Sequence, residues 1–283
     1  MTDIGLASIG ISGDKSSTTS HLTPLKQSEG SYWGFDMAVN GDEIVLAGYH
    51  RDILTGGSWN DITNIFMLHS NDAKSSSWTT KMNVLSDIDI KPQDGDALAV
   101  GIGEEIHILY QAMRDDVTGI ERVGLFYAHG VISQTPFSFQ APAGDDASMP
   151  EMMVVEHKGD DVLVAAWIEG SGRSAEIISV VQDSIWSVDV YNNNSAPGAS
   201  KIVMMHMSED KIKVYHDEIG VLGPVTRYGM YNVGDSEIAL SNLIAKGNVV
   251  GAGSIGEDAI VIMTSPSGLI SGMKIANINP NSN

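Results

Sequence analysis

A unit of four short apolar runs recurs along this chain about every 50 to 60 residues. In each copy an alternating run leads into a Gly/Asp/Asn turn, then a second run that ends in an aromatic residue, then two further runs. The aromatic residues that end the second run are Tyr49, Tyr110, Trp167 and Tyr215. Alternation at period two predicts strands, and strand units repeated at this period are typical of a β-propeller.

We therefore predict an all-β fold, a single β-propeller over residues 1–283 with five blades of four antiparallel strands. A sixth blade stays open as an alternative if residues 5–25 form a reduced one. The fifth unit begins near Asn248 and lacks its own fourth strand. We expect the N-terminal strand, residues 4–12, to supply it and close the ring, which removes an open edge. Residues 13–30 are then a connecting loop.

Composition excludes several classes of function. The formal charge is -20, from 36 acidic and 16 basic residues, and such a field repels nucleic acids and anionic membranes. No apolar run is long enough for membrane insertion, and the N-terminus does not read as a signal peptide. There is no cysteine, which excludes disulfides, thiolate metal sites and a cysteine nucleophile.

The first unit resembles the repeats of sialidase-like, Asp-box propellers. The matching segments are Asp36-Met-Ala-Val39, Ser70-Asn-Asp72 and Ser77-Trp78-Thr79. An Asp-box has glycine two residues after its Asp and an aromatic residue five after it. Here Lys74 takes the glycine position, and Trp78 lies six residues after Asp72. The resemblance implies the fold and, less directly, a glycan-related function.

Three carboxylates fall at the same phase, where the first strand of successive units begins: Asp36, Asp96 and Glu151. In a propeller such positions line the mouth of the central channel. Their order resembles the Asp, Asp, Glu set of five-bladed glycoside hydrolases of the arabinanase/xylosidase and invertase types. In that set one carboxylate activates water or attacks the sugar, one tunes a pKa, and one protonates the leaving oxygen. The alternative is that they are turn residues of the repeat.

Cationic and aromatic residues give a candidate ligand-binding set. Arg51, Arg114 and Arg173 each follow the second run of their unit, so we expect them in loops on the face that carries the carboxylates. The resemblance to sialidases, which clamp a substrate carboxylate with three arginines, makes them candidates. Solvated loop ion pairs are the alternative. Trp59, in the long loop 52–63, is a further candidate contact.

Cofactors are not expected, with one alternative. Acidic loops before the second and third units contain Asp94, Asp96, Asp145 and Asp146. Oxygen-rich loops can hold Ca²⁺, although EF-hand spacing is absent.

The regular repeat without a strict catalytic signature favours a non-enzymatic recognition or assembly protein. Because no export signal is visible, we place it on a virion (phage) surface, where it would bind a host glycan or a neighbouring structural protein. The alternative is a five-bladed glycoside hydrolase that uses Asp36, Asp96 and Glu151. A propeller scaffold accommodates both functions.

Overall fold

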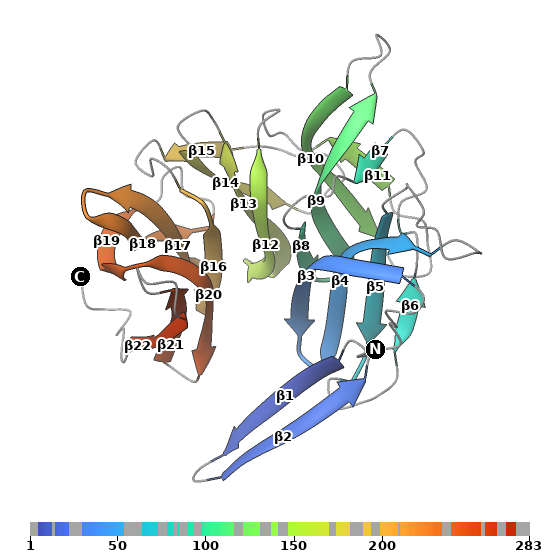
Figure 1. The fold of residues 1–283 in the computed structure, drawn as a ribbon, viewed down its shortest axis with the longest axis horizontal. Coiled ribbons are helices and arrows are strands. Elements are labelled where there is room, and N and C mark those ends of the chain that lie inside the picture. The colour runs from blue at the N-terminus through green and yellow to red at the C-terminus, as the bar shows by residue number, and fades with distance from the viewer. Residues whose placement is uncertain are drawn as a thin grey trace. The chain divides into compact units, whose positions relative to one another are not determined.

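The computed structural model describes residues 5–12, 15–22, 30–53, 64–72, 78–81, 84, 90–92, 98–115, 121–130, 137–140, 147–169, 174–181, 189–193, 199–208, 210–233, 239–255, 258–264 and 270–275. Within these ranges the regular elements are strands, so the all-β prediction is confirmed (Figure 1). The same ranges contain no helix long and apolar enough to cross a membrane.

The chain divides into two units, and the first comprises residues Met1–Phe139. It begins with a hairpin of β1 (Gly5–Ser12) and β2 (Lys15–Leu22). The next sheet has the order β3 (Gly30–Asn40), β4 (Glu43–Asp52), β5 (Asn64–Ser70) and β6 (Thr79–Lys81). The third sheet contains β7 (Ile90–Pro92), β8 (Leu98–Ile102), β9 (Ile106–Asp115), β10 (Glu121–Gly130) and β11 (Phe137–Gln140), and both β7 and β8 pair with β9.

The second unit, Gln140–Asn283, contains three antiparallel sheets in which successive strands are neighbours. The first has β12 (Ser148–His157), β13 (Asp160–Glu169), β14 (Ser174–Val181) and β15 (Asp189–Asn193). The second has β16 (Ile202–Ser208), β17 (Lys211–Gly220), β18 (Gly223–Asn232) and β19 (Ala239–Lys246). The third has β20 (Asn248–Ile255), β21 (Asp258–Thr264) and β22 (Ile270–Ile275).

The N-terminal segment differs from the expected connecting loop. β1 pairs with β2 along its whole length, from Gly5 opposite Leu22 to Ser12 opposite Lys15. Residues 13–30 therefore contain a strand. A Ser/Thr-rich segment can form one because the backbone supplies the ladder and threonine favours extended structure. Closure of the last sheet by residues 4–12, the five-bladed ring and the single domain over residues 1–283 stay predictions.

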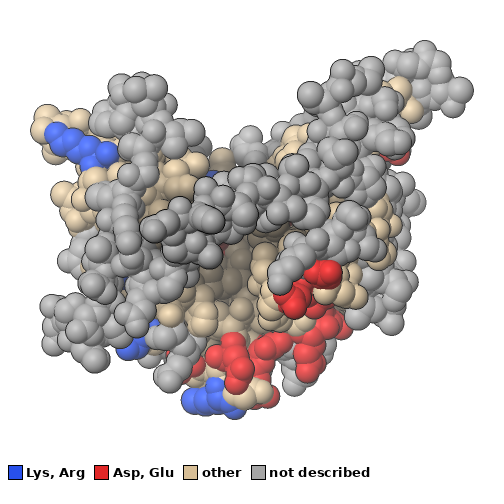
Figure 2. Space-filling view, turned by 90° about the horizontal axis from the view of Figure 1, so that it is seen from below, with Lys and Arg blue, Asp and Glu red and all other residues tan. Residues whose placement is uncertain are grey.

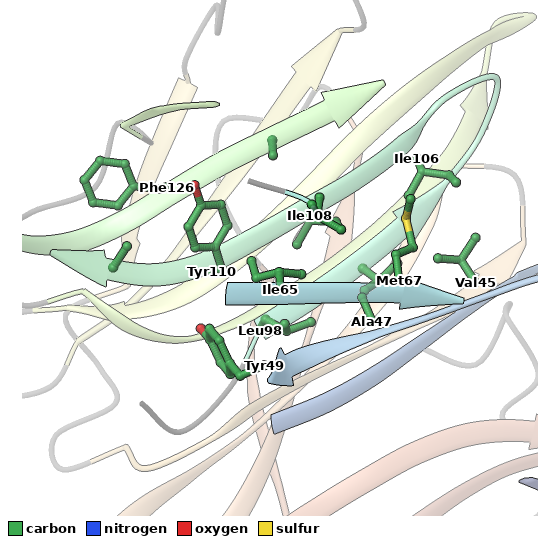
Figure 3. Packing of buried hydrophobic residues seen from close by; sticks show 14 of the residues in the cluster. Val45, Ala47, Tyr49, Ile65, Met67, Leu98, Ile106, Ile108, Tyr110 and Phe126 are labelled. Carbon is green, nitrogen blue, oxygen red and sulfur yellow. The ribbon is translucent and has the colours of Figure 1, made fainter. Parts of the chain in front are cut away.

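The core of the first unit lies between its two larger sheets (Figure 3). Alternate residues of β4 and β5 face alternate residues of β8 and β9, which is why period-two patterning in the sequence places them together. The buried side chains include Val45, Ala47, Tyr49, Ile65, Met67, Leu98, Val100, Ile106, Ile108 and Tyr110. In the second unit one cluster joins β12–β15 to β16–β19, and another joins β16–β19 to β20–β22.

The four aromatic residues that end the second run are all fully buried, as a packing role requires. They do not all face the same way. Tyr49 and Tyr110 both lie in the cluster of the first unit, although they come from different sheets. Trp167 alternates with Ala166 and Ile168, which pack toward β16–β19. A one-residue change in phase turns a strand side chain to the other face.

The hydroxyl of Tyr49 fills a gap in strand pairing. On one edge of β9, β8 pairs with residues up to Tyr110 and β7 pairs from Ala112 onward, which leaves Gln111 between them. Tyr49 Oη accepts a hydrogen bond from Gln111 N at 3.1 Å and donates one to Gln111 O at 3.4 Å. A side chain of one sheet thus continues the backbone ladder of the next.

Candidate functional site

Asp36 follows a bulge in β3. Trp33 pairs with Tyr49 and Asp36 pairs with Ala47, so Gly34 and Phe35 together face one residue of β4. Gly34 has φ +63°, in the left-handed region. A Cβ there would lie 2.7 Å from the Tyr49 ring, so the position requires glycine. Bulges of this type redirect the side chains that follow them and are common beside active sites.

Glu151 follows a similar irregularity in β12. The register shifts between Ser148 and Glu151, and Glu151 pairs with Ala166. Met149 has φ +51°, which is unusual for a residue with a side chain. Gly34 and Met149 each lie two positions before a predicted catalytic carboxylate. A strained residue of this kind is tolerated only where its surroundings hold it, and such residues gather at functional sites.

The carboxylate of Asp36 reaches the neighbouring sheet. Its Oδ2 accepts a hydrogen bond from Val100 N in β8 at 2.7 Å. The side chain is partly buried, and the charge-assisted bond fixes its orientation. Asp36 is thus held between β3 and β8 of two adjacent sheets rather than in a solvated turn.

Arg51 and Trp33 lie on the same face of the β3–β4 pair as Asp36. Trp33 is opposite Tyr49, and Arg51 is two residues further along β4, so their side chains share a face. The guanidinium carbon of Arg51 lies 5.8 Å from the Trp33 ring centroid, and the Trp33 ring stacks on Tyr49 at 6.1 Å. A planar cation, an aromatic ring and a carboxylate therefore occupy one sheet face.

His50 lies on the opposite face and is 1% exposed. Burial lowers the pKa of His50 below its usual value, and nearby Asp52 partly opposes this shift. Its ring packs against Phe66 and Tyr32, at centroid distances of 6.5 and 6.3 Å. Neither ring nitrogen has a hydrogen-bond partner among the described residues. The imidazole is therefore a neutral packing group rather than a proton donor for the site.

Carboxylates gather at the turns that join the first and second strands, at the opposite end of each sheet from Arg51. Glu43 Oε1 lies 2.5 Å from His69 Nε2, and Glu105 Oε2 lies 2.6 Å from His129 Nδ1. Figure 2 shows Asp and Glu side chains gathered in one region of the visible face. These histidines contact the carboxylates of the acidic turns, whereas Arg51 lies at the other end of its strand.

Several predicted site residues lie outside the described residues: Asp94, Asp96, Asp145, Asp146, Trp59 and Arg173. Arg51 and Arg114 were expected in loops, but both lie within strands, in β4 and β9. These strands are longer than expected because hairpin pairing continues past the aromatic residue, as in Asp115 opposite Glu121. In the described part of the chain, no three His, Asp or Glu side chains are placed to hold a metal ion.

Trp33 and the bulge at Gly34 were not predicted. The signal was visible in Tyr32-Trp33-Gly34-Phe35, where a glycine interrupts an aromatic run directly before Asp36. A glycine inside a strand pattern suggests a bulge. No such signal precedes Glu151, because Met149 is not a residue type that favours positive φ.

No family model matches this chain and no curated protein matches it. Among solved structures, the NanB sialidase of Streptococcus pneumoniae matches with a TM-score of 0.54 at 8% identity, over 86% of this chain and 58% of that one. A polysaccharide lyase of family PL25, an ulvan lyase, matches with a TM-score of 0.51 at 10% identity, over 91% and 66%. The sialidase of Trypanosoma rangeli matches with a TM-score of 0.50 at 12% identity, over 97% and 51%.

These likenesses show the fold, which is of the sialidase and glycosidase propeller type. This chain spans about half to two thirds of the length of these three proteins. The prediction of a non-enzymatic recognition or assembly protein on a virion surface is wrong, because the three solved structures named above share the fold and are two sialidases and a lyase, which process glycans. The absence of a strict sequence motif does not exclude catalysis by a propeller.

Proposed function

We propose that this protein is a glycoside hydrolase whose catalytic carboxylates are Asp36, Asp96 and Glu151. The observation that carries the proposal is the shared local geometry of Asp36 and Glu151. Each lies on the first strand of a sheet, directly after a register shift, two residues after a residue with left-handed backbone. Two carboxylates reoriented in the same way are what glycosidic bond cleavage uses.

The roles follow from the surroundings of each group. Asp36 is held by a backbone N–H donor, which suits an ionised group that activates water or attacks the sugar. Glu151 is the candidate acid for the leaving oxygen. Asp96 precedes β8 by two residues, and we assign it the tuning role. The proposed ligand contacts are Arg51 with Trp33, Arg114, Arg173 and Trp59. Binding of Ca²⁺ by the acidic loops is also part of the proposal.

We also propose that the sheets form a five-bladed ring with degenerate Asp-box turns. Support comes from the sheet β20–β22, which has three strands, whereas the sheets β3–β6, β12–β15 and β16–β19 each have four. A strand from residues 4–12 would complete it. The turn after β5 gives further support, since Ser70 Oγ donates to Asp72 O at 3.0 Å and Trp78 packs on the Leu46, Phe66 and Leu68 cluster.

The test is a set of charge-neutral variants assayed on a mixed panel of neutral and sialylated glycans. Asp36→Asn keeps a carbonyl oxygen that can accept from Val100 N, and Glu151→Gln keeps the side-chain shape. We expect each to lower the release of shortened glycans at least about 100-fold while the melting temperature changes little. Mass spectrometry of the products, with and without Ca²⁺, reports the activity.

The matched control is Asp217→Asn. Asp217 is buried, and its carboxylate accepts from Ser200 N at 2.7 Å, Lys201 N at 2.9 Å and Ser200 Oγ. This carboxylate caps the start of β16, so its variant should lose stability and keep turnover. Full activity in both Asp36→Asn and Glu151→Gln would show that the assignment is wrong.

A further inference from the structure

A lysine and a tyrosine are buried between the sheets β16–β19 and β20–β22. Lys213 and Tyr215 lie two residues apart on β17, so their side chains leave the same face of that strand. Tyr215 packs in the apolar cluster that joins the two sheets, and Lys213 is opposite Met205 of β16, a member of the same cluster. Lys213 is 1% exposed and Tyr215 is 0% exposed. The amine and the phenol therefore enter one interface and are shielded from water.

Neither group has an acceptor in the described part of the chain. Lys213 Nζ and Tyr215 Oη make no hydrogen bond there, and burial lowers the pKa of Lys213 with no opposing contribution from a described carboxylate. The Tyr228 ring, with its centroid 4.6 Å from Lys213 Nζ, is the contact that the amine does make. The side chains that β20 and β21 bring to the interface are apolar: Val249, Ala252, Val261 and Met263. Buried polar groups are almost always hydrogen-bonded, so two such donors in one interface point to a ligand that accepts from both.

The chemistry of the two groups selects the class of ligand. A lysine ammonium offers three N–H donors and no acceptor, and a phenol offers one O–H donor. A water molecule would accept from both but would leave the buried positive charge uncompensated, which is costly. A divalent oxyanion would bring an excess of negative charge into an apolar interface. A monovalent, compact anion matches the charge, and Met205 and Met230, opposite Lys213 on the two neighbouring strands, are flexible enough to pack around it.

We propose that Lys213 and Tyr215 form a binding site for a monovalent halide, such as chloride, between the sheets β16–β19 and β20–β22. The ammonium supplies the counter-charge and N–H donors, and the phenol supplies an O–H donor. The site forms only when the two sheets pack together, so the halide binds the folded protein and not the unfolded chain. Halide concentration therefore sets part of the stability of the second unit. This inference goes beyond the proposed function and uses none of its carboxylates.

The experiment is urea unfolding of the whole protein at pH 7, with sodium chloride replacing sodium isethionate at constant ionic strength. Constant ionic strength keeps the screening of the net charge of -20 unchanged. At a chloride concentration ten times Kd, the unfolding equilibrium constant of the wild type should be about 11-fold lower than in isethionate. Lys213→Met should show no such response, and Tyr215→Phe should need about 10-fold more chloride because it keeps the cation but loses one donor. The matched control is Lys211→Met, which removes the same charge from a partly exposed position on the same strand and should respond like the wild type.

A second measurement locates the anion. Anomalous scattering from crystals grown in sodium bromide should show bromide beside Lys213 Nζ. In isethionate alone, Lys213→Met should be more stable than the wild type, since the wild-type amine has no counter-charge there, and chloride should reduce that difference. A wild type that does not respond to chloride, an equal response of Lys213→Met, or bromide bound only elsewhere would overturn the proposal. Glycan cleavage is not measured, so failure of the proposed function would leave this inference standing.

Discussion

Tyr49 and Tyr215 occupy the same position in their repeats and are both fully buried, but their hydroxyls meet different surroundings. In the first unit, Tyr49 Oη bonds both backbone groups of Gln111 in the adjacent sheet. Between β16–β19 and β20–β22, Tyr215 Oη has no hydrogen-bond partner among the described residues. One interface between sheets is matched in polarity as well as in shape, and the other is matched in shape only.

The second interface also contains an amine. Lys213, two residues before Tyr215 on β17, is 1% exposed. Its Nζ lies 4.6 Å from the Tyr228 ring centroid and has no hydrogen-bond partner in the described part of the chain. Burying an amine without a partner is costly, and the ring face offsets part of that cost. Burial of apolar side chains is therefore common to both interfaces, whereas the hydrogen bonding of their buried polar groups differs from one interface to the other.

The largest loss of stability should follow removal of the buried tyrosine ring, which both interfaces contain. Tyr49→Ala and Tyr215→Ala each remove a fully buried ring, so we expect each to lower the free energy of unfolding by about 3–5 kcal/mol. Urea unfolding monitored by circular dichroism measures both. If Tyr215→Ala cost far less than Tyr49→Ala, the second interface would not be packed as tightly as the first.

Lys213→Met should raise stability by about 1 kcal/mol at pH 7, because it keeps the volume and removes a buried amine that has no hydrogen-bond partner among the described residues. Burial lowers the pKa of Lys213 below its usual value of 10.5. Between that lowered pKa and 10.5 the unfolded chain binds a proton that the folded protein does not, so stability rises with pH in this window. The advantage of the variant should therefore shrink as the pH approaches 10.5.

Tyr215 provides the internal control for that pH series. Burial first, and then the neighbouring Tyr228, raises the pKa of Tyr215 from 10.0 to about 12. Between these values the folded protein keeps a proton that the unfolded chain has lost, so stability falls as the pH rises. Both the wild type and Lys213→Met should show this fall. A wild type and variant with parallel curves below pH 10 would contradict a buried, deprotonating amine.

Much of the fold could be predicted because strand patterning is local. The second unit shows this: the second run of the fourth repeat, which ends in Tyr215, lies in β17 (Lys211–Gly220). The strand bounds differ from the expected ones where the side chains are polar. Residues 15–22 form β2 with hardly any apolar side chains, and β17 continues to Gly220 because its partner β18 continues with it. Backbone pairing decides such ends, and the sequence of one strand does not show it.

The candidate site could be predicted in part. The phase of Asp36 and Glu151 placed both on first strands, as found. The bulges before them depend on the register with β4 and β13, so only Gly34 gave a local sign of one. The partner of Tyr49 depends on the gap between β7 and β8, which no pattern in residues 90–102 reveals.

The smallest effects test the comparison most directly. Tyr49→Phe leaves the N–H and C=O of Gln111 without their partner and should cost about 1 kcal/mol. Tyr215→Phe removes a hydroxyl that bonds nothing in the described chain, so its cost should be near zero. Both keep the ring, so packing is constant and the difference in urea midpoint isolates the hydroxyl. Equal costs would mean that Tyr215 has a partner of its own, and the two interfaces would then be alike in polarity too.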